Sequence, residues 1–118
     1  PNYDAGHVAA AVKDLEAAKL PPRLMVDCSH ANSSKQHRKQ IEVTQAVAQQ
    51  IAAGDARICG VMIESHLQEG RQDIVPGQPL QHGVSVTDAC IGWEQTVPVL
   101  QGLAVAVRQR RAQRLNAL

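Results

Sequence analysis

The chain has 118 residues, of which 44% are hydrophobic, and a formal net charge of +1 at pH 7. This length predicts a single domain with a buried core. The near-neutral charge and the 2% content of aromatic residues argue against a nucleic-acid partner, which requires a basic surface and aromatic side chains that stack on bases. No apolar run approaches the ~20 residues that cross a bilayer, and no signal-peptide pattern begins the chain. We therefore expect a soluble, cytoplasmic protein without a membrane partner.

The first third of the chain predicts a helix and a strand. Apolar residues at helical spacing follow a candidate N-cap at Asp4, and Pro21 and Pro22 end this pattern. The apolar run of residues 24–26 then predicts a short strand that is covered on both faces, as in a parallel sheet.

A second helix and a second strand are expected next. Ser33 and Gln36 have the spacing of a capping box, which predicts that the helix begins there. Gly54 is well placed beyond the end of this helix, where a left-handed conformation is common. The uncharged run of residues 58–63 predicts a second buried strand.

The last part of the chain predicts a long loop, a weaker strand and a helix. Residues 65–84 show no sustained period, and a loop of this length is usually functional or mobile. Residues 85–90 predict the third strand, and Pro98 is expected in the first turn of the helix that follows. At the end of that helix we expect a solvated cluster of four arginines rather than an RNA-binding patch: Arg108, Arg110, Arg111 and Arg114.

The cysteine pattern does not indicate a disulfide framework. Cys28, Cys59 and Cys90 are odd in number, show no C-x-x-C spacing and lie in apolar surroundings typical of strands or strand ends. We therefore expect reduced, buried thiols.

The order of these elements predicts an α/β fold with a parallel sheet. Three strands do not complete such a fold, since a barrel of eight βα units takes ~250 residues. The chain also begins at Pro1 rather than Met, directly before a helical pattern. We therefore expect residues 1–118 to be a single C-terminal fragment of a (βα)8 TIM barrel, about strands six to eight with their helices, which is incomplete as an isolated chain.

Each predicted strand brings one chemically active side chain to the same edge of the sheet. His30 follows the first strand, Glu64 ends the second, and Asp88 lies in the third. Reactive groups gather at the carboxyl ends of parallel strands. An imidazole and two carboxylates there suit a divalent metal ion such as Mn, Fe, Co or Zn. Capping, ion pairing and general acid/base roles remain open for the same residues.

Taken singly, each of these residues also has a structural explanation. His30 is typical of a hydrogen-bonded loop histidine, and Asp88 could cap the following turn. Glu64 could instead form an ion pair with Arg57 or Arg71.

Neighbouring polar residues are weaker candidates for the metal site. Asp27 could be a ligand, although its position favours a role in orienting His30 through a hydrogen bond. His66 is close enough to Glu64 to be a second candidate. The remaining histidines are expected at the surface: His7, His37 and His82.

Lys35 is a candidate phosphate-binding residue. It lies beside Ser33 and Ser34 at a predicted helix N-terminus, where free amides and the helix dipole favour an anion. The capping box explains the serines without a ligand.

Three extended motifs carry a resemblance to a known family. VDCSHANSSKQ, GVMIESHLQEG and SVTDACIGWE, in this order and with these separations, resemble the C-terminal third of class I 3-deoxy-D-arabino-heptulosonate 7-phosphate (DAHP) synthases. The resemblance implies a (βα)8 barrel that condenses phosphoenolpyruvate with erythrose 4-phosphate and releases phosphate. This is the first step of the shikimate pathway to the aromatic amino acids.

The resemblance also implies roles for individual residues. In the family a divalent metal is bound by a cysteine, a histidine, a glutamate and an aspartate, and the last three fall on His30, Glu64 and Asp88. His30 would also lie beside phosphoenolpyruvate, and Asp88 would help to position the aldose or a water, so both are expected to be catalytic and substrate-binding. The cysteine comes from an early barrel strand and is absent from this chain, and Cys28 is not its equivalent.

The family's basic residues that bind the substrates' phosphates are also missing, so we expect this chain alone to be inactive. The open sheet edges of an incomplete barrel favour association, and a homo-oligomer is expected. The alternative function is a non-catalytic folding or assembly module that carries a vestigial metal site.

Overall fold

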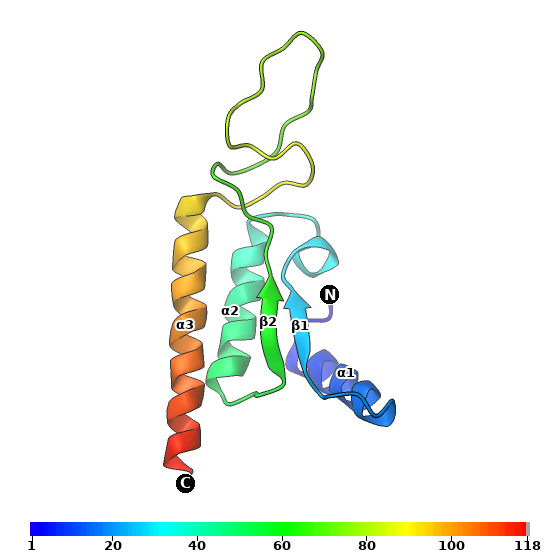
Figure 1. Ribbon diagram of the computed structural model, residues 1–118, viewed down its shortest axis with the longest axis vertical. Coiled ribbons are helices and arrows are strands. Elements are labelled where there is room, and N and C mark those ends of the chain that lie inside the picture. The colour runs from blue at the N-terminus through cyan, green and yellow to red at the C-terminus, as the bar shows by residue number, and fades with distance from the viewer. Residues whose placement is uncertain (118) are drawn as a thin grey trace.

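The computed structural model describes residues 1–117 and has an α/β architecture. A small parallel sheet lies beside helices α2 and α3, and a long loop extends from one end of the molecule (Figure 1). The elements, in chain order, are α1 (Ala5–Ala17), β1 (Leu24–Asp27), the 3-10 helix η1 (His30–Ser33), α2 (Lys39–Ala52), β2 (Ile58–Met62) and α3 (Trp93–Asn116). Within the described residues, no helix combines the length and apolar character that crossing a membrane requires.

The sheet places the ends of its strands side by side. Within residues 1–117 it consists of β1 and β2, which are parallel as predicted and pair from Leu24 with Ile58 to Asp27 with Met62. The N–H of Cys28 extends the pairing by donating to the Met62 carbonyl at 2.9 Å. The chain therefore leaves both strands at the same edge of the sheet.

The predicted third strand, residues 85–90, does not form a regular strand. This segment meets the preceding loop through isolated bridges, which join Ser85 to Arg71 and Cys90 to Gly70. The physical reason is that its backbone groups pair at separate points with an irregular loop, so that no continuous ladder forms. The absence of regular elements in residues 65–84 agrees with the prediction for that loop.

The start of α1 is confirmed, but its end has another cause than the one predicted. The Asp4 carboxylate accepts a hydrogen bond from the N–H of His7 at 3.0 Å, as expected of an N-cap. The helix ends before the two prolines, because Lys19 adopts a left-handed conformation with φ of 58°. The N–H of Leu20 then donates to the Leu15 carbonyl, which completes a Schellman motif.

The predicted capping box before α2 is wrong. Ser33 belongs to η1, and its hydroxyl donates to the His30 carbonyl at 3.2 Å instead of capping α2. Ser34 and Lys35 then take left-handed conformations, and α2 begins only at Lys39. The Ser33 hydroxyl thus bonds within η1 instead of capping α2, because short polar side chains can form alternative local hydrogen bonds to the main chain.

Helix α3 begins after Gly92, whose N–H donates to the Gln95 side chain at 2.8 Å. Pro98 therefore lies in the second turn rather than in the predicted first turn, where it removes one internal helix bond. Further along, Arg110 donates to the carbonyl oxygens of Asp55 and Ile58 at 2.8 and 3.1 Å. One arginine of the cluster thus holds the turn after α2, while Gly54 in that turn has the expected positive φ of 113°.

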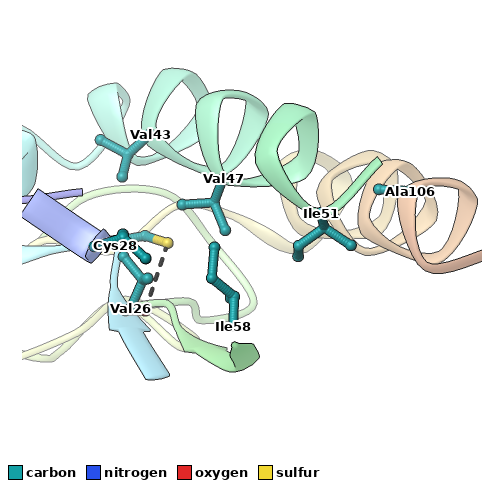
Figure 2. Packing of buried hydrophobic residues seen from close by; sticks show 8 residues of the cluster. Val26, Cys28, Val43, Val47, Ile51, Ile58 and Ala106 are labelled. Carbon is teal, nitrogen blue, oxygen red and sulfur yellow. Dashed lines mark hydrogen bonds between the residues drawn. The ribbon is translucent and has the colours of Figure 1, made fainter. Parts of the chain in front are cut away.

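The core lies between the sheet and α2, with α3 closing its far end (Figure 2). Val47, Ile58 and Cys28 are fully buried there. The opposite face of the sheet is open, contrary to the prediction that both faces are covered, since Met25 is 62% exposed. Cys59 is exposed for the same reason, because successive strand residues face opposite sides. The three cysteines are free as expected, but only Cys28 and Cys90 are buried.

Candidate metal centre

Three residues that lie far apart in the sequence meet at the carboxyl edge of the sheet. His30 opens the 3-10 turn after β1, and Glu64 follows the end of β2 by two residues. Asp88 comes from the segment that returns after the long loop. The structure therefore brings together all three side chains that the sequence suggested as metal ligands.

The three side chains face one another closely enough to share one ion. The His30 Nε2 atom lies 4.0 Å from Glu64 Oε1 and 3.4 Å from Asp88 Oδ2. One nitrogen or oxygen atom from each residue lies within 4.8 Å of the others. The Glu64 side chain is 22% exposed, whereas those of His30 and Asp88 are 53% and 65% exposed, so a ligand from solvent can reach this arrangement.

The ring of His30 is oriented by the residues directly before it. Its Nδ1 atom lies 2.9 Å from Asp27 Oδ2 and 2.9 Å from the Ser29 hydroxyl. The hydrogen bond to Asp27 raises the pKa of His30, and the charge of Asp27 adds to this rise. With Nδ1 engaged in this way, Nε2 is the nitrogen that faces Glu64 and Asp88.

Asp27 is held as tightly as the histidine that it orients. Its Oδ1 atom accepts the N–H of Ser29 at 2.8 Å and the Ser29 hydroxyl at 2.5 Å, while the Asn32 amide donates to its main-chain carbonyl. Partial burial works against ionisation, but the hydrogen bonds from Ser29 and His30 outweigh it and lower the pKa of Asp27. These contacts fit the predicted orienting role better than a role as ligand.

Glu64 is held through its main chain by Gln40, a residue that the sequence did not indicate. The Gln40 side chain bonds to both the N–H and the carbonyl of Glu64. Burial raises the pKa of the Glu64 carboxyl, and the neighbouring Asp88 carboxylate raises it further. Two carboxyls placed together in this way favour a cation between them.

The arginines considered as partners of Glu64 are bound elsewhere. Arg57 pairs with Asp55 at 2.9 Å, and Arg71 pairs with Asp73 at 2.6 Å. The ion-pair explanation of Glu64 is therefore not supported by the contacts of these two arginines.

A cavity of about 390 Å³ opens over the three side chains, and basic residues lie on its wall. Lys35 is one of them, although it lies in the turn before α2 and not at a helix N-terminus as predicted. Arg71 is a second, and the sequence did not single it out for binding. The sequence indicates such a role only through the position of Arg71 directly after the motif GVMIESHLQEG. The residues around the cavity include His30, Lys35, Gln40, Glu64, Arg71 and Asp88.

The other histidines lie outside the cluster of three. His66 is exposed, and its ring accepts the N–H of Leu67 at 2.8 Å. His82 is exposed and His7 pairs with Asp4 at the surface, as predicted. His37 differs from the prediction, because its side chain is only 24% exposed and lies 2.8 Å from Glu69.

Comparisons with known proteins identify the family. The family model described as DAHP synthetase I matches residues 1–101. The chain is 63% identical over 115 residues to the tyrosine-inhibited phospho-2-dehydro-3-deoxyheptonate aldolase of Schizosaccharomyces pombe, covering 94% of this chain and 31% of that protein. It is 56% identical over 111 residues to the Phe-sensitive enzyme of that name from Escherichia coli, covering 94% of this chain and 32% of that protein.

A solved structure agrees with these relatives. The phospho-2-dehydro-3-deoxyheptonate aldolase of Francisella tularensis matches with a TM-score of 0.89 and 45% identity, over 93% of this chain and 32% of that one. The chain thus spans about a third of the length of the relatives that it matches. The matched motifs, sequences and backbone together show that this chain belongs to the DAHP synthetase I family.

Proposed function

We propose that the full-length protein carrying this chain is a DAHP synthase, which condenses phosphoenolpyruvate with erythrose 4-phosphate. The observation that carries the proposal is the meeting of His30, Glu64 and Asp88 from three separate segments in one cavity. Relatives that are 63% and 56% identical bear the name phospho-2-dehydro-3-deoxyheptonate aldolase, which supports the same reaction.

The fold proposal is that β1, β2 and the irregular segment of residues 85–90 take the places of the last three strands of a (βα)8 barrel. The parallel pairing of β1 with β2 supports it, as does the backbone likeness to the Francisella tularensis aldolase. In such a barrel the exposed face that carries Met25 would be covered by the remaining strands.

We propose His30, Glu64 and Asp88 as three ligands of a divalent metal of the Mn, Fe, Co or Zn class. The donor set fits, since Nε2 of His30 faces two carboxylates while Nδ1 is bound to Asp27. A fourth ligand, a cysteine, would come from another part of the full-length protein. A bound metal would supply Lewis-acid polarisation of the erythrose 4-phosphate aldehyde.

The residues of this chain would hold and orient the substrates. Lys35 and Arg71 line the cavity and would attract phosphate or carboxylate groups, and Asp88 would position the aldose or a water. In the reaction, C3 of phosphoenolpyruvate forms a bond to the aldehyde carbon and water adds at C2. The C–O bond to the phosphate then breaks, which releases inorganic phosphate.

The isolated chain is expected to be inactive and to associate. It lacks the family's further substrate clamps, and the orientation that such clamps provide is worth ~7–11 kcal/mol of a barrier. Its open sheet face, with Met25 62% exposed and Met62 37% exposed, favours contact with a second copy. Light scattering should show a dimer or a larger species, and a monodisperse monomer would contradict this expectation.

Phosphate release by the full-length protein tests the proposed reaction. Release should require both substrates together, and a chelator should abolish it. His30→Ala should remove the activity, whereas His82→Ala should retain it because His82 is an exposed residue outside the cavity. A folded full-length protein that releases no phosphate from the two substrates would overturn the proposal.

A further inference from the structure

Gln40 is a buried polar residue whose side chain forms hydrogen bonds to the main chain of one residue of the site, Glu64. It lies in the first turn of α2 and is 1% exposed. Its Oε1 atom accepts the N–H of Glu64 at 2.8 Å, and its Nε2 atom donates to the Glu64 carbonyl at 3.1 Å. One amide group thus binds both main-chain groups of a single residue.

The position of Glu64 explains why these bonds matter. The ladder between the strands ends where Asp27 pairs with Met62, so Glu64 lies beyond it. A partly buried N–H at this point requires another partner, since an unpaired buried amide is costly. The Glu64 carbonyl also accepts from the N–H of Ile91 at 3.1 Å. The main chain of Glu64 is therefore held from α2 on one hand and from the segment after Asp88 on the other.

We infer that Gln40 is a positioning residue, which fixes the main chain of Glu64 and so directs its carboxylate toward His30 and Asp88. The inference rests on the proposed metal site formed by these three residues. Gln40 lines the same cavity, and it binds the main chain of Glu64, whose carboxylate lies 4.0 Å from His30 Nε2. Residues that orient metal ligands typically change metal affinity by about 10–100-fold when replaced.

A purely structural role for Gln40 predicts a different result, and Thr44 provides the matched control. Thr44 lies one turn further along α2, is 3% exposed, and donates to the Ile41 carbonyl at 2.8 Å. Its hydrogen bond stays within the helix. Replacing either residue by an apolar one of similar size removes side-chain hydrogen bonds of α2, two at Gln40 and one at Thr44, but only the change at Gln40 releases Glu64.

The test measures Mn²⁺ affinity and stability separately in the full-length protein. Free Mn²⁺ is followed by electron paramagnetic resonance during titration, and thermal unfolding is recorded with a chelator present. Gln40→Met should weaken Mn²⁺ binding about 10–100-fold. Thr44→Val should keep the affinity even if its loss of thermal stability is as large. A folded Gln40→Met protein with unchanged affinity would overturn the inference.

Two further variants keep the result decisive. If Gln40→Met does not fold, Gln40→Asn replaces it, because the amide is kept but is one methylene too short to reach both groups of Glu64. Weakened binding in that variant supports the inference, and unchanged binding refutes it. His30→Ala distinguishes failure of the proposed metal site from failure of the inference about Gln40. If His30→Ala leaves the Mn²⁺ affinity unchanged, the proposed metal site itself is wrong. If it abolishes binding while the Gln40 variants bind normally, only the role of Gln40 is refuted.

Discussion

The two halves of the candidate site are built in different ways. The half after β1 is local, because Asp27 orients His30 within four residues and the Ser29 hydroxyl contacts both. The half that carries Asp88 is long-range, since it follows the loop of residues 65–84 and is held by isolated bridges. His30 therefore takes its orientation from its neighbours in the sequence, whereas Asp88 depends on how the long loop packs.

Glu69 is the main polar anchor at the base of that loop. It binds His37 at 2.8 Å and Arg38 next to it, and the Gln95 amide lies 3.4 Å away. His37 and Arg38 lie directly before α2, and Gln95 lies in the first turn of α3. The loop is thus connected to the same end of α2 from which Gln40 holds Glu64.

The largest expected effect comes from removing one proposed ligand from each half. His30→Ala and Asp88→Ala should each remove most of the activity, a larger loss than the about 10–100-fold typical of residues that only orient a ligand, since both are proposed to bind the metal itself. Phosphate release by the full-length protein measures this effect, with His82→Ala as the control. A loss confined to one of the two variants would show that the halves do not act as one site.

Asp27→Asn should disturb the orientation of His30 in the local half, with a smaller loss of metal affinity and activity than the removal of a ligand. The N–H and hydroxyl of Ser29 should keep the amide oxygen of the new Asn on their side, so that its nitrogen faces His30 Nδ1 and cannot accept the proton there. Mn²⁺ affinity and kcat should therefore fall about 10–100-fold while the fold is kept. Titration with Mn²⁺ and a thermal unfolding curve provide the measurements. Asp14→Asn, at an exposed position of α1, is the control. Wild-type affinity in Asp27→Asn would show that His30 does not need this partner.

Glu69→Gln should loosen only the long-range half. The ion pair of Glu69 with Arg38 is accessible to solvent, and such pairs contribute about 0.2–1 kcal/mol. The amides of Gly70 and Cys90, which bond to each other's carbonyls, should therefore exchange up to about five-fold faster. The Ser29 amide, bonded to Asp27, should keep its exchange rate. Hydrogen exchange read residue by residue checks both statements. Equal acceleration at Ser29 would mean that the two halves are not independent.

The smallest effect is a dependence of stability on pH. Hydrogen bonds from Arg38 and His37 lower the pKa of Glu69 to about 2 in the folded protein, below its ordinary value of 4.5. Its contribution to stability is therefore complete above about pH 4.5 and is lost as the pH falls toward 2. The difference in unfolding free energy between wild type and Glu69→Gln should shrink across this range. A constant difference would contradict the assignment.

Much of the local structure could be predicted from the sequence alone. The N-cap at Asp4, the apolar runs of both strands and the turn at Gly54 are patterns within a few residues, and each was confirmed. The capping box at Ser33 was wrong because the same polar residues also suit the 3-10 turn that carries His30. Local patterns thus identify elements well, but they do not decide between two local hydrogen-bond schemes that use the same side chains.

The assembly of the site depends on tertiary packing. The residue types that follow each strand could be predicted without it, and with them His30, Glu64 and Asp88 as candidates. Only packing across the sheet edge and between helices placed Gln40 on the main chain of Glu64 and Arg71 in the cavity wall. Tertiary packing also explains residues 85–90, which meet the long loop through isolated bridges instead of forming the predicted strand. These contacts join residues 14 or more positions apart, and no periodicity or short motif records which distant partner a buried polar group will meet.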